Sequence, residues 1–100
     1  MKNEIIKEYV VQIAKRFELP TEQMFEKTKR RDIVDARQML YYLCIDRNIK
    51  PSYIKLSLKK FYNFDVERST ILHGNKKAKS LLESDSDIKK MLYQIQENVK

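Results

Sequence analysis

The sequence contains very little glycine, proline and cysteine. Its 100 residues include one glycine, two prolines, one cysteine and no tryptophan. Because the tight turns of β-sheets draw on glycine and proline, this scarcity favours helices joined by short loops. A lone cysteine, Cys44, forms neither an internal disulfide nor a cysteine-rich metal site. It lies in the apolar run MLYYLCI, so we interpret it as a small buried hydrophobic side chain.

The sequence also lacks the motifs of common enzyme and metal sites. It has no GxxxxGKS/T phosphate loop, no HExxH motif and no Cys/His pair at metal-ligand spacing. Ser69, His73 and Glu67 are the residue types of a hydrolase triad. On one helix, however, the three side chains do not all point in the same direction, and no oxyanion site accompanies them. We therefore predict no enzymatic activity, no cofactor, no metal and no small-molecule substrate.

Long apolar runs are absent as well. Hydrophobic residues make up 42% of the chain, which is ordinary for a globular protein. No window approaches the roughly 18 apolar residues of a membrane-spanning helix, and the stretch MKNEIIKEYV lacks the pattern of a signal peptide. An intracellular soluble protein is therefore expected.

The charge is strongly unbalanced toward basic residues, with a formal net charge of +7 at pH 7. In so short a chain this excess indicates a polyanionic partner, with nucleic acid first and an acidic membrane surface second. A soluble protein that is basic without such a partner is the alternative.

The spacing of apolar residues predicts a compact all-α domain of about five to six helices. Helix starts are expected at the capping residues Asn3, Thr21, Asp32 and Ser52. Asn48 is expected to stop a helix, because asparagine tolerates the left-handed conformation. The expected helices cover residues 3–19, a short piece after 21, 32–48, 52–64, a helix from 65 or 67 to 81 or 82, and 86–100.

Residues 53–61, YIKLSLKKF, fit two periods. Ile54, Leu56 and Leu58 alternate as in a β-strand, whereas Ile54, Leu58 and Phe61 fit one face of a helix. We predict a helix here, because a lone short strand would have no partner in this chain.

The segment VERSTILHGNKKAK, residues 66–79, divides into two faces on a helical wheel. Its outer face carries hydrogen-bonding and cationic groups without an acid, as a DNA recognition helix requires. A solvated face of an ordinary amphipathic helix fits the same pattern equally well. The inner face holds Ile71, Asn75, Ala78 and Leu82, and the outer face holds Ser69, His73, Lys76 and Lys77, with Thr70 at its margin and Arg68 in the first turn.

Two motifs resemble the C-terminal DNA-binding domain of the bacterial chromosomal replication initiator DnaA. TKRRDIVDARQMLYYL, residues 28–43, is similar to that family's basic loop and its ARQ-M or PRQ-M helix. VERSTILHGNKKAK is similar to its RDHTTVLHA-like motif and the basic pair that follows. The resemblance implies that residues 1–100 form one DnaA C-terminal-like domain of Trp-repressor-like fold, with a helix-turn-helix whose second helix opens near residue 67. It implies sequence-specific binding of double-stranded DNA in replication initiation or its regulation, without ATPase activity.

The resemblance also assigns roles to individual residues. Lys29 occupies the place of an arginine that enters the minor groove, and Arg37 matches a residue near the DNA backbone. His73 matches a histidine that approaches phosphate. The DNA-binding residues that we predict are Lys29, Arg30, Arg31, Arg37, Gln38, Glu67, Arg68, Ser69, Thr70, His73, Lys76 and Lys77.

The sequence departs from the family at the residues that read bases. The family's Asp-His pair is Glu67-Arg68 here, and its preceding Gly-Gly is replaced by NFDV. Glutamate accepts from cytosine N4, whereas arginine prefers guanine O6 and N7. We therefore expect DNA binding with a base preference that differs from the family's.

Two other partners fit parts of the sequence. The same fold could serve as an interaction module that binds and regulates a replication or transcription protein. Acidic lipid needs only the positive charge, and since no segment pairs a clean apolar face with a fully basic one, we rank a membrane last. The resemblance favours a cytoplasmic protein of a bacterial cell or its nucleoid, with a phage or mobile element as another source.

Overall fold

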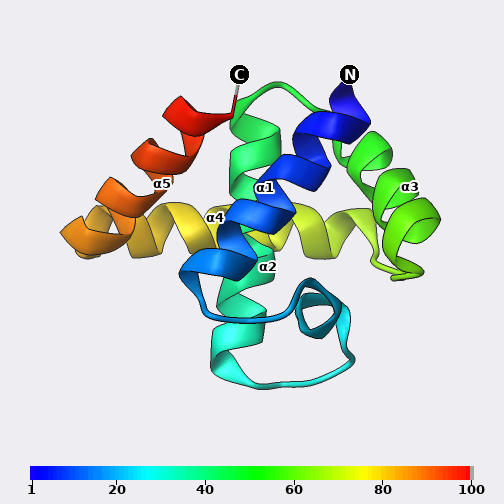
Figure 1. Ribbon diagram of the computed structural model, residues 1–100, viewed down its shortest axis with the longest axis horizontal. Helices are drawn as coiled ribbons and strands as arrows, with labels where there is room; N and C mark the ends of the chain where they lie inside the picture. The colour runs from blue at the N-terminus through cyan, green and yellow to red at the C-terminus, as the bar shows by residue number, and fades with distance from the viewer. Residues whose placement is uncertain (100) are drawn as a thin grey trace.

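The computed structural model describes residues 1–99 as a series of helices joined by short connections (Figure 1). No β-strand occurs in this range. Residues 1–99 fold into a compact all-α domain of five α-helices, which agrees with the predicted fold class, and residues 51–62 form a helix rather than a strand. In chain order the elements are α1 (Lys2–Arg16), the short 3₁₀ helix η1 (Thr21–Phe25), α2 (Arg31–Asp46), α3 (Pro51–Tyr62), α4 (Arg68–Ser84) and α5 (Ser86–Asn98).

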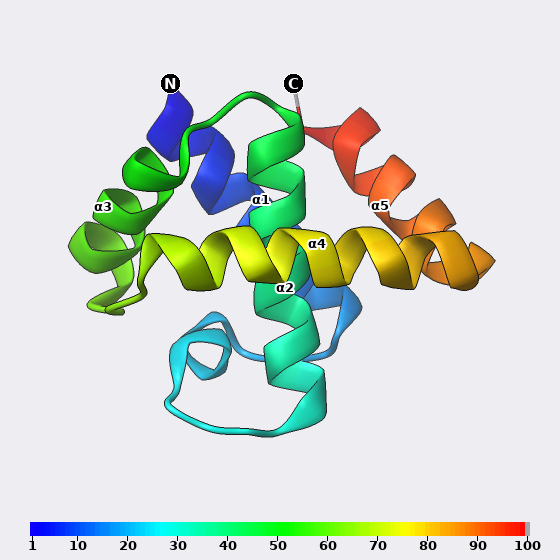
Figure 2. The same ribbon diagram turned by 180° about the vertical axis from the view of Figure 1, so that it is seen from behind.

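Helix α2 is the centre of the molecule. In Figure 1, α1 crosses in front of it, and in Figure 2, seen from behind, α4 crosses in front of it on the opposite side. Helices α3 and α5 flank this stack on either side, while η1 lies beside the N-terminal part of α2 and the loop that follows it passes the N-terminal end of α2 (Figure 2). Because α2 is covered on two sides, it is apolar over a wider arc than a surface helix.

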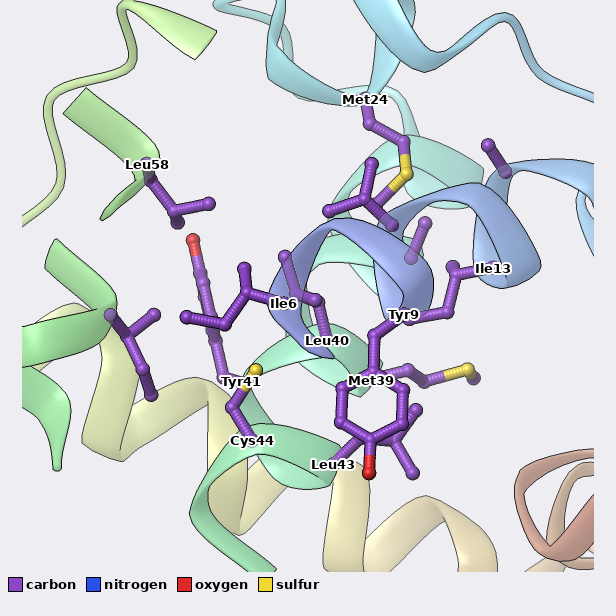
Figure 3. Close-up of a cluster of buried hydrophobic side chains, with 14 of the residues drawn as sticks. Ile6, Tyr9, Ile13, Met24, Met39, Leu40, Tyr41, Leu43, Cys44 and Leu58 are labelled. Atoms are coloured by element: carbon purple, nitrogen blue, oxygen red, sulfur yellow. The ribbon is translucent and has the colours of Figure 1, made fainter. Parts of the chain in front are cut away.

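The hydrophobic core forms around α2, with side chains from every helix. Figure 3 shows part of it, with labelled residues from α1, η1, α2 and α3. The inner face of α2 consists of Ile33, Ala36, Leu40, Leu43 and Cys44, all of them fully buried. Met39 and Tyr41 are buried in addition, because α4 covers a further side of this helix. Cys44 is fully buried, which agrees with its interpretation as a core residue, and burial raises the pKa of its thiol to about 12.

Three helices end at a residue with positive φ, and none of these residues is glycine. Glu18 follows α1 with φ 54°, Asn48 follows α2 with φ 65°, and Asn63 follows α3 with φ 51°. The stop predicted at Asn48 is confirmed: the Ile49 amide donates to the Cys44 carbonyl at 3.0 Å, which closes the last turn. Asparagine tolerates this left-handed conformation, so α2 and α3 end at Asn48 and Asn63 without glycine.

The helix starts predicted at Asn3, Thr21, Asp32 and Ser52 are wrong by one or two residues, whereas α4 begins after Glu67 and α5 begins at Ser86, as predicted. The capping positions are Met1, Pro20, Arg30 and Lys50, and none of them caps with its side chain. Asn3 lies inside α1, where its Oδ1 accepts a hydrogen bond from the Ser57 hydroxyl at 2.6 Å and ties α1 to α3. The local capping pattern therefore does not set these helix starts; backbone geometry and a contact between helices do.

Candidate nucleic-acid interface

The first two turns of α4 have the two faces that the sequence predicts. Glu67 is the N-cap residue with extended backbone, and the helix begins at Arg68. Ile71, Asn75 and Ala78 are buried. Nothing covers the opposite face in the view of Figure 2, where α4 lies in front. The exposed residues of that face are Arg68, Ser69, Thr70, His73, Lys76 and Lys77.

The polar groups of this outer face are free. Within residues 1–99, none of the six side chains forms a salt bridge or a hydrogen bond with another part of the protein. Leu72 of the same helix is also 48% exposed. The face therefore presents unpaired donors and cations, with Glu67 at its edge as the sole acid in these two turns.

Gly74, the only glycine of the chain, sets how closely α4 approaches α2. A Cβ atom at this position would lie 2.7 Å from Tyr41 Cδ2 and 3.3 Å from Gln38 Cγ. The missing side chain therefore lets the second turn of α4 rest directly on the Tyr41 ring. Sequence reasoning did not assign this role to Gly74; an isolated glycine inside a helical pattern was the available signal.

This close approach leaves a cleft of about 300 Å³ between α2, the start of α4 and the connection before it. Thr70 and His73 line it from α4, and Arg37 and Gln38 line it from α2. The structure thus brings these four predicted site residues together, although they are more than 30 positions apart in sequence.

The connection between α3 and α4 is fixed by two lysines of α3. Lys55 Nζ donates to the Val66 carbonyl at 2.9 Å. Lys59 Nζ lies 3.2 Å from Asn63 Oδ1 and 3.3 Å from Asp65 Oδ2. These contacts, with Asn63 in the left-handed conformation, hold the turn without a glycine.

The basic loop, residues 26–31, carries cations that differ in how far they are neutralised. Arg30 forms two hydrogen bonds to Asp32, from Nε at 3.2 Å and from Nη2 at 2.8 Å. The hydrogen bond from Arg30 lowers the pKa of the Asp32 carboxyl and raises the pKa of the guanidinium. Arg31 lies 3.5 Å from Asp35, whereas Lys29 is exposed and has no ion-pair partner within residues 1–99.

Arg37 points into the protein toward the basic loop. Its Nη1 donates to the Met24 carbonyl at 3.0 Å and to the Glu26 carbonyl at 2.8 Å. Burial lowers the pKa of its guanidinium. Sequence reasoning placed Arg37 near the DNA backbone by resemblance and missed these contacts, because the carbonyl groups that it binds are 11 and 13 positions away.

A second, shallower hollow of about 410 Å³ lies on the other side of the outer face. Arg68, Ser69 and Leu72 meet the start of α3 here, at Lys50 and Ser52. The sequence analysis did not include Lys50 and Ser52 in the site, since only the packing of α3 against α4 brings them beside Arg68.

Three other findings bear on the site. No cluster of histidine, cysteine and carboxylate side chains suited to a metal ion occurs within residues 1–99. No helix in the same range is both long and apolar enough to cross a membrane. Comparison of the chain with protein-family models, curated proteins and solved structures finds no significant match.

Proposed function

We propose that this chain binds double-stranded DNA in a sequence-specific manner through a helix-turn-helix, with α3 as its first helix and α4 as its recognition helix. The proposed architecture is of the DnaA C-terminal, Trp-repressor-like type, and the proposed role is in replication initiation or its regulation, without ATPase activity. The observation that carries the proposal is the outer face of α4, from Arg68 to Lys77, which is exposed, cationic and unpaired within residues 1–99.

The two ends of this face suit two kinds of contact. The N-terminal residues of a recognition helix reach base edges in the major groove, and donors along its flank meet phosphates. In this arrangement Glu67 and Arg68 meet bases, and Ser69 and Thr70 contribute hydroxyl groups. Lys76 and Lys77, two turns further on, meet the backbone.

The basic loop supplies a second point of contact. It lies beyond the N-terminal end of α2, below α4 in the view of Figure 2. Lys27 and Lys29 are its cations without an ion-pair partner within residues 1–99, and the Lys29 side chain can enter a minor groove or meet a phosphate. A helix in one groove and a loop beside the next would use the basic residues of both segments.

Salt dependence tests the proposal directly. The affinity for a short labelled duplex, measured by fluorescence anisotropy, should fall linearly with salt on logarithmic axes, with a slope of about −0.9 for each phosphate contact. Absence of duplex binding at low salt would refute the proposal.

A matched pair of variants tests which face is used. Lys76→Ala should weaken binding to all sequences and reduce the salt slope by about 1. Lys15→Ala removes the same charge from an exposed position of α1, a helix on the other side of α2 from α4. This variant should leave the slope unchanged (Figure 1). Equal effects of the two variants would indicate diffuse electrostatic attraction rather than a specific face. If the chain binds no DNA but does bind a protein partner, the interaction module is favoured instead.

A further inference from the structure

Arg37 ties together two segments that are separated in sequence. Besides its bonds to the Met24 and Glu26 carbonyls, Nη2 lies 3.4 Å from the Thr28 carbonyl. The backbone from the end of η1 into the basic loop therefore wraps around one guanidinium group. No other hydrogen bond within residues 1–99 reaches residues 27–29 from outside the loop.

The guanidinium group also lies over an aromatic ring of the α3–α4 connection. Its Cζ is 5.1 Å from the centre of the Phe64 ring, within the range of a cation–π contact. The Phe64 ring is in turn 5.4 Å from the ring of Phe25 in η1, which stacks on Tyr62 at 4.4 Å. Arg37 thus contacts both the basic loop and the segment that leads into α4.

The geometry of this contact requires arginine. Guanidinium is planar and presents five N–H donors in a fixed fork, so it bonds several carbonyl groups and stacks on a ring at the same time. A lysine ammonium keeps the charge but has neither the fork nor the flat face. These two properties, charge and shape, can therefore be separated by a single substitution.

We propose that Arg37 is a positioning residue that holds the basic loop and the start of α4 in one fixed relation, so that Lys29 and Glu67-Arg68 meet duplex DNA together. This inference rests on the proposed DNA-binding function and assigns Arg37 a role other than a phosphate contact. Its donors bind protein carbonyls, and the groups that touch DNA are those it places.

Arg37→Lys separates positioning from charge. If Arg37 positions the loop, the lysine variant should lose affinity for duplex DNA by about tenfold, nearly as much as Arg37→Ala. If Arg37 contacts phosphate, lysine should retain most of the affinity, and that outcome overturns the proposal. Arg16→Lys is the matched control, because Arg16 bonds Gln94 on α5 at 2.7 Å, away from both segments.

A double-mutant cycle shows whether Arg37 acts through the loop. The loss caused by Arg37→Lys should be several-fold smaller when Lys29 is already alanine, because the residue being positioned is then gone. Equal losses in both backgrounds would mean that Arg37 acts independently of the loop, which contradicts the proposal.

Limited proteolysis of the free protein gives a readout that does not depend on DNA. Trypsin should cleave after Lys27 or Lys29 faster in Arg37→Lys than in Arg16→Lys, while circular dichroism shows both variants folded. Phe64→Leu keeps an apolar side chain but removes the ring, and it should also speed cleavage. Unchanged cleavage rates in both Arg37→Lys and Phe64→Leu would overturn the proposal that Arg37 anchors the basic loop. If cleavage speeds up as expected but the unmodified chain binds no DNA, only the proposed function is refuted.

Discussion

Arg68 is the residue of the outer face with the greatest capacity to discriminate between bases. It is the first residue of α4, it is exposed, and it has no partner within residues 1–99. A bidentate guanidinium pairs well with guanine O6 and N7. Its neighbour Glu67 is the one acid beside it, so in the proposed complex we expect the two residues together to favour a G·C-containing step.

Arg68→Ala should relax the base preference at one position of the target. The expected cost is about 1–3 kcal/mol on the preferred site, with little change on unrelated duplexes. The preferred site is obtained first by selection from a random duplex pool, and affinities are then compared on duplexes that differ at single base pairs. Lys15→Ala serves as the control of equal charge, and a uniform loss on every duplex would show that Arg68 contacts only phosphate.

Gly74 shows that a residue with no side chain can decide the shape of the site. A glycine in the middle of a helix normally costs about 1 kcal/mol relative to alanine. Here the space that a Cβ would need is occupied by Tyr41, which is 2% exposed and packed in the core. The close approach of α4 to α2 depends on this position.

Gly74→Ala should therefore destabilise the protein although it improves helix propensity. Overpacking a filled interface costs typically about 1–3 kcal/mol, which exceeds the propensity gain. Urea unfolding measures the difference, and Ser80→Ala, at an exposed position of the same helix, shows the propensity effect alone. A more stable Gly74→Ala variant would show that α2 and α4 separate without cost.

At the scale of elements, the basic loop and α4 differ in how their cations are used. Arg30 and Arg31 are paired with acids in the first turns of α2. The cations of α4 have no such partners within residues 1–99. In the proposed DNA complex, the carboxylates of Asp32 and Asp35 would therefore compete with phosphate for Arg30 and Arg31.

Asp32→Asn should increase DNA affinity by releasing Arg30. Asparagine retains an oxygen to accept the bond that the Ile33 amide now gives to Asp32 at 2.9 Å, so the start of α2 should be kept. The salt slope should become steeper by up to about 1. Glu8→Gln on α1 changes the net charge equally and should have a smaller effect; the same gain in both variants would contradict a specific role for Arg30.

The elements themselves were largely predictable, and some of their ends were not. The five α-helices and the short turn that carries Met24 and Phe25 follow from apolar spacing, because burial of one face is a local and periodic requirement. Helix starts depend on small differences between neighbouring capping residues. At Asn3 and Ser52 a tertiary contact and a proline at the first helical position decided the outcome.

At the scale of the whole molecule, the core sets the stability and its dependence on pH. Burial raises the pKa of the Cys44 thiol from 9.0 to about 12 and that of the Tyr41 hydroxyl from 10.0 to about 12. Both groups are neutral when protonated, and the unfolded chain releases their protons at lower pH than the folded chain. The contribution of these two buried groups to the free energy of unfolding is complete below pH 9 and is lost as pH rises toward 12.

The free energy of unfolding should therefore fall above pH 9, by about 1 kcal/mol per pH unit for each group above its ordinary pKa. Urea unfolding between neutral pH and the alkaline range measures this slope. Cys44→Ala should be less stable at neutral pH but should decline less steeply between pH 9 and 10. Parallel declines of the two proteins would mean that the thiol does not contribute.

The amino-acid sequence by itself determined the all-α class, the helices, the excess of basic charge and the two faces of α4. These properties follow from composition and from periods of a few residues, which act wherever the chain goes. Only the tertiary structure decided that Gly74 rests on Tyr41, that Arg37 binds the basic loop, and which cations stay unpaired within residues 1–99. Each of these depends on atoms brought together from distant parts of the chain, so no local pattern could specify it.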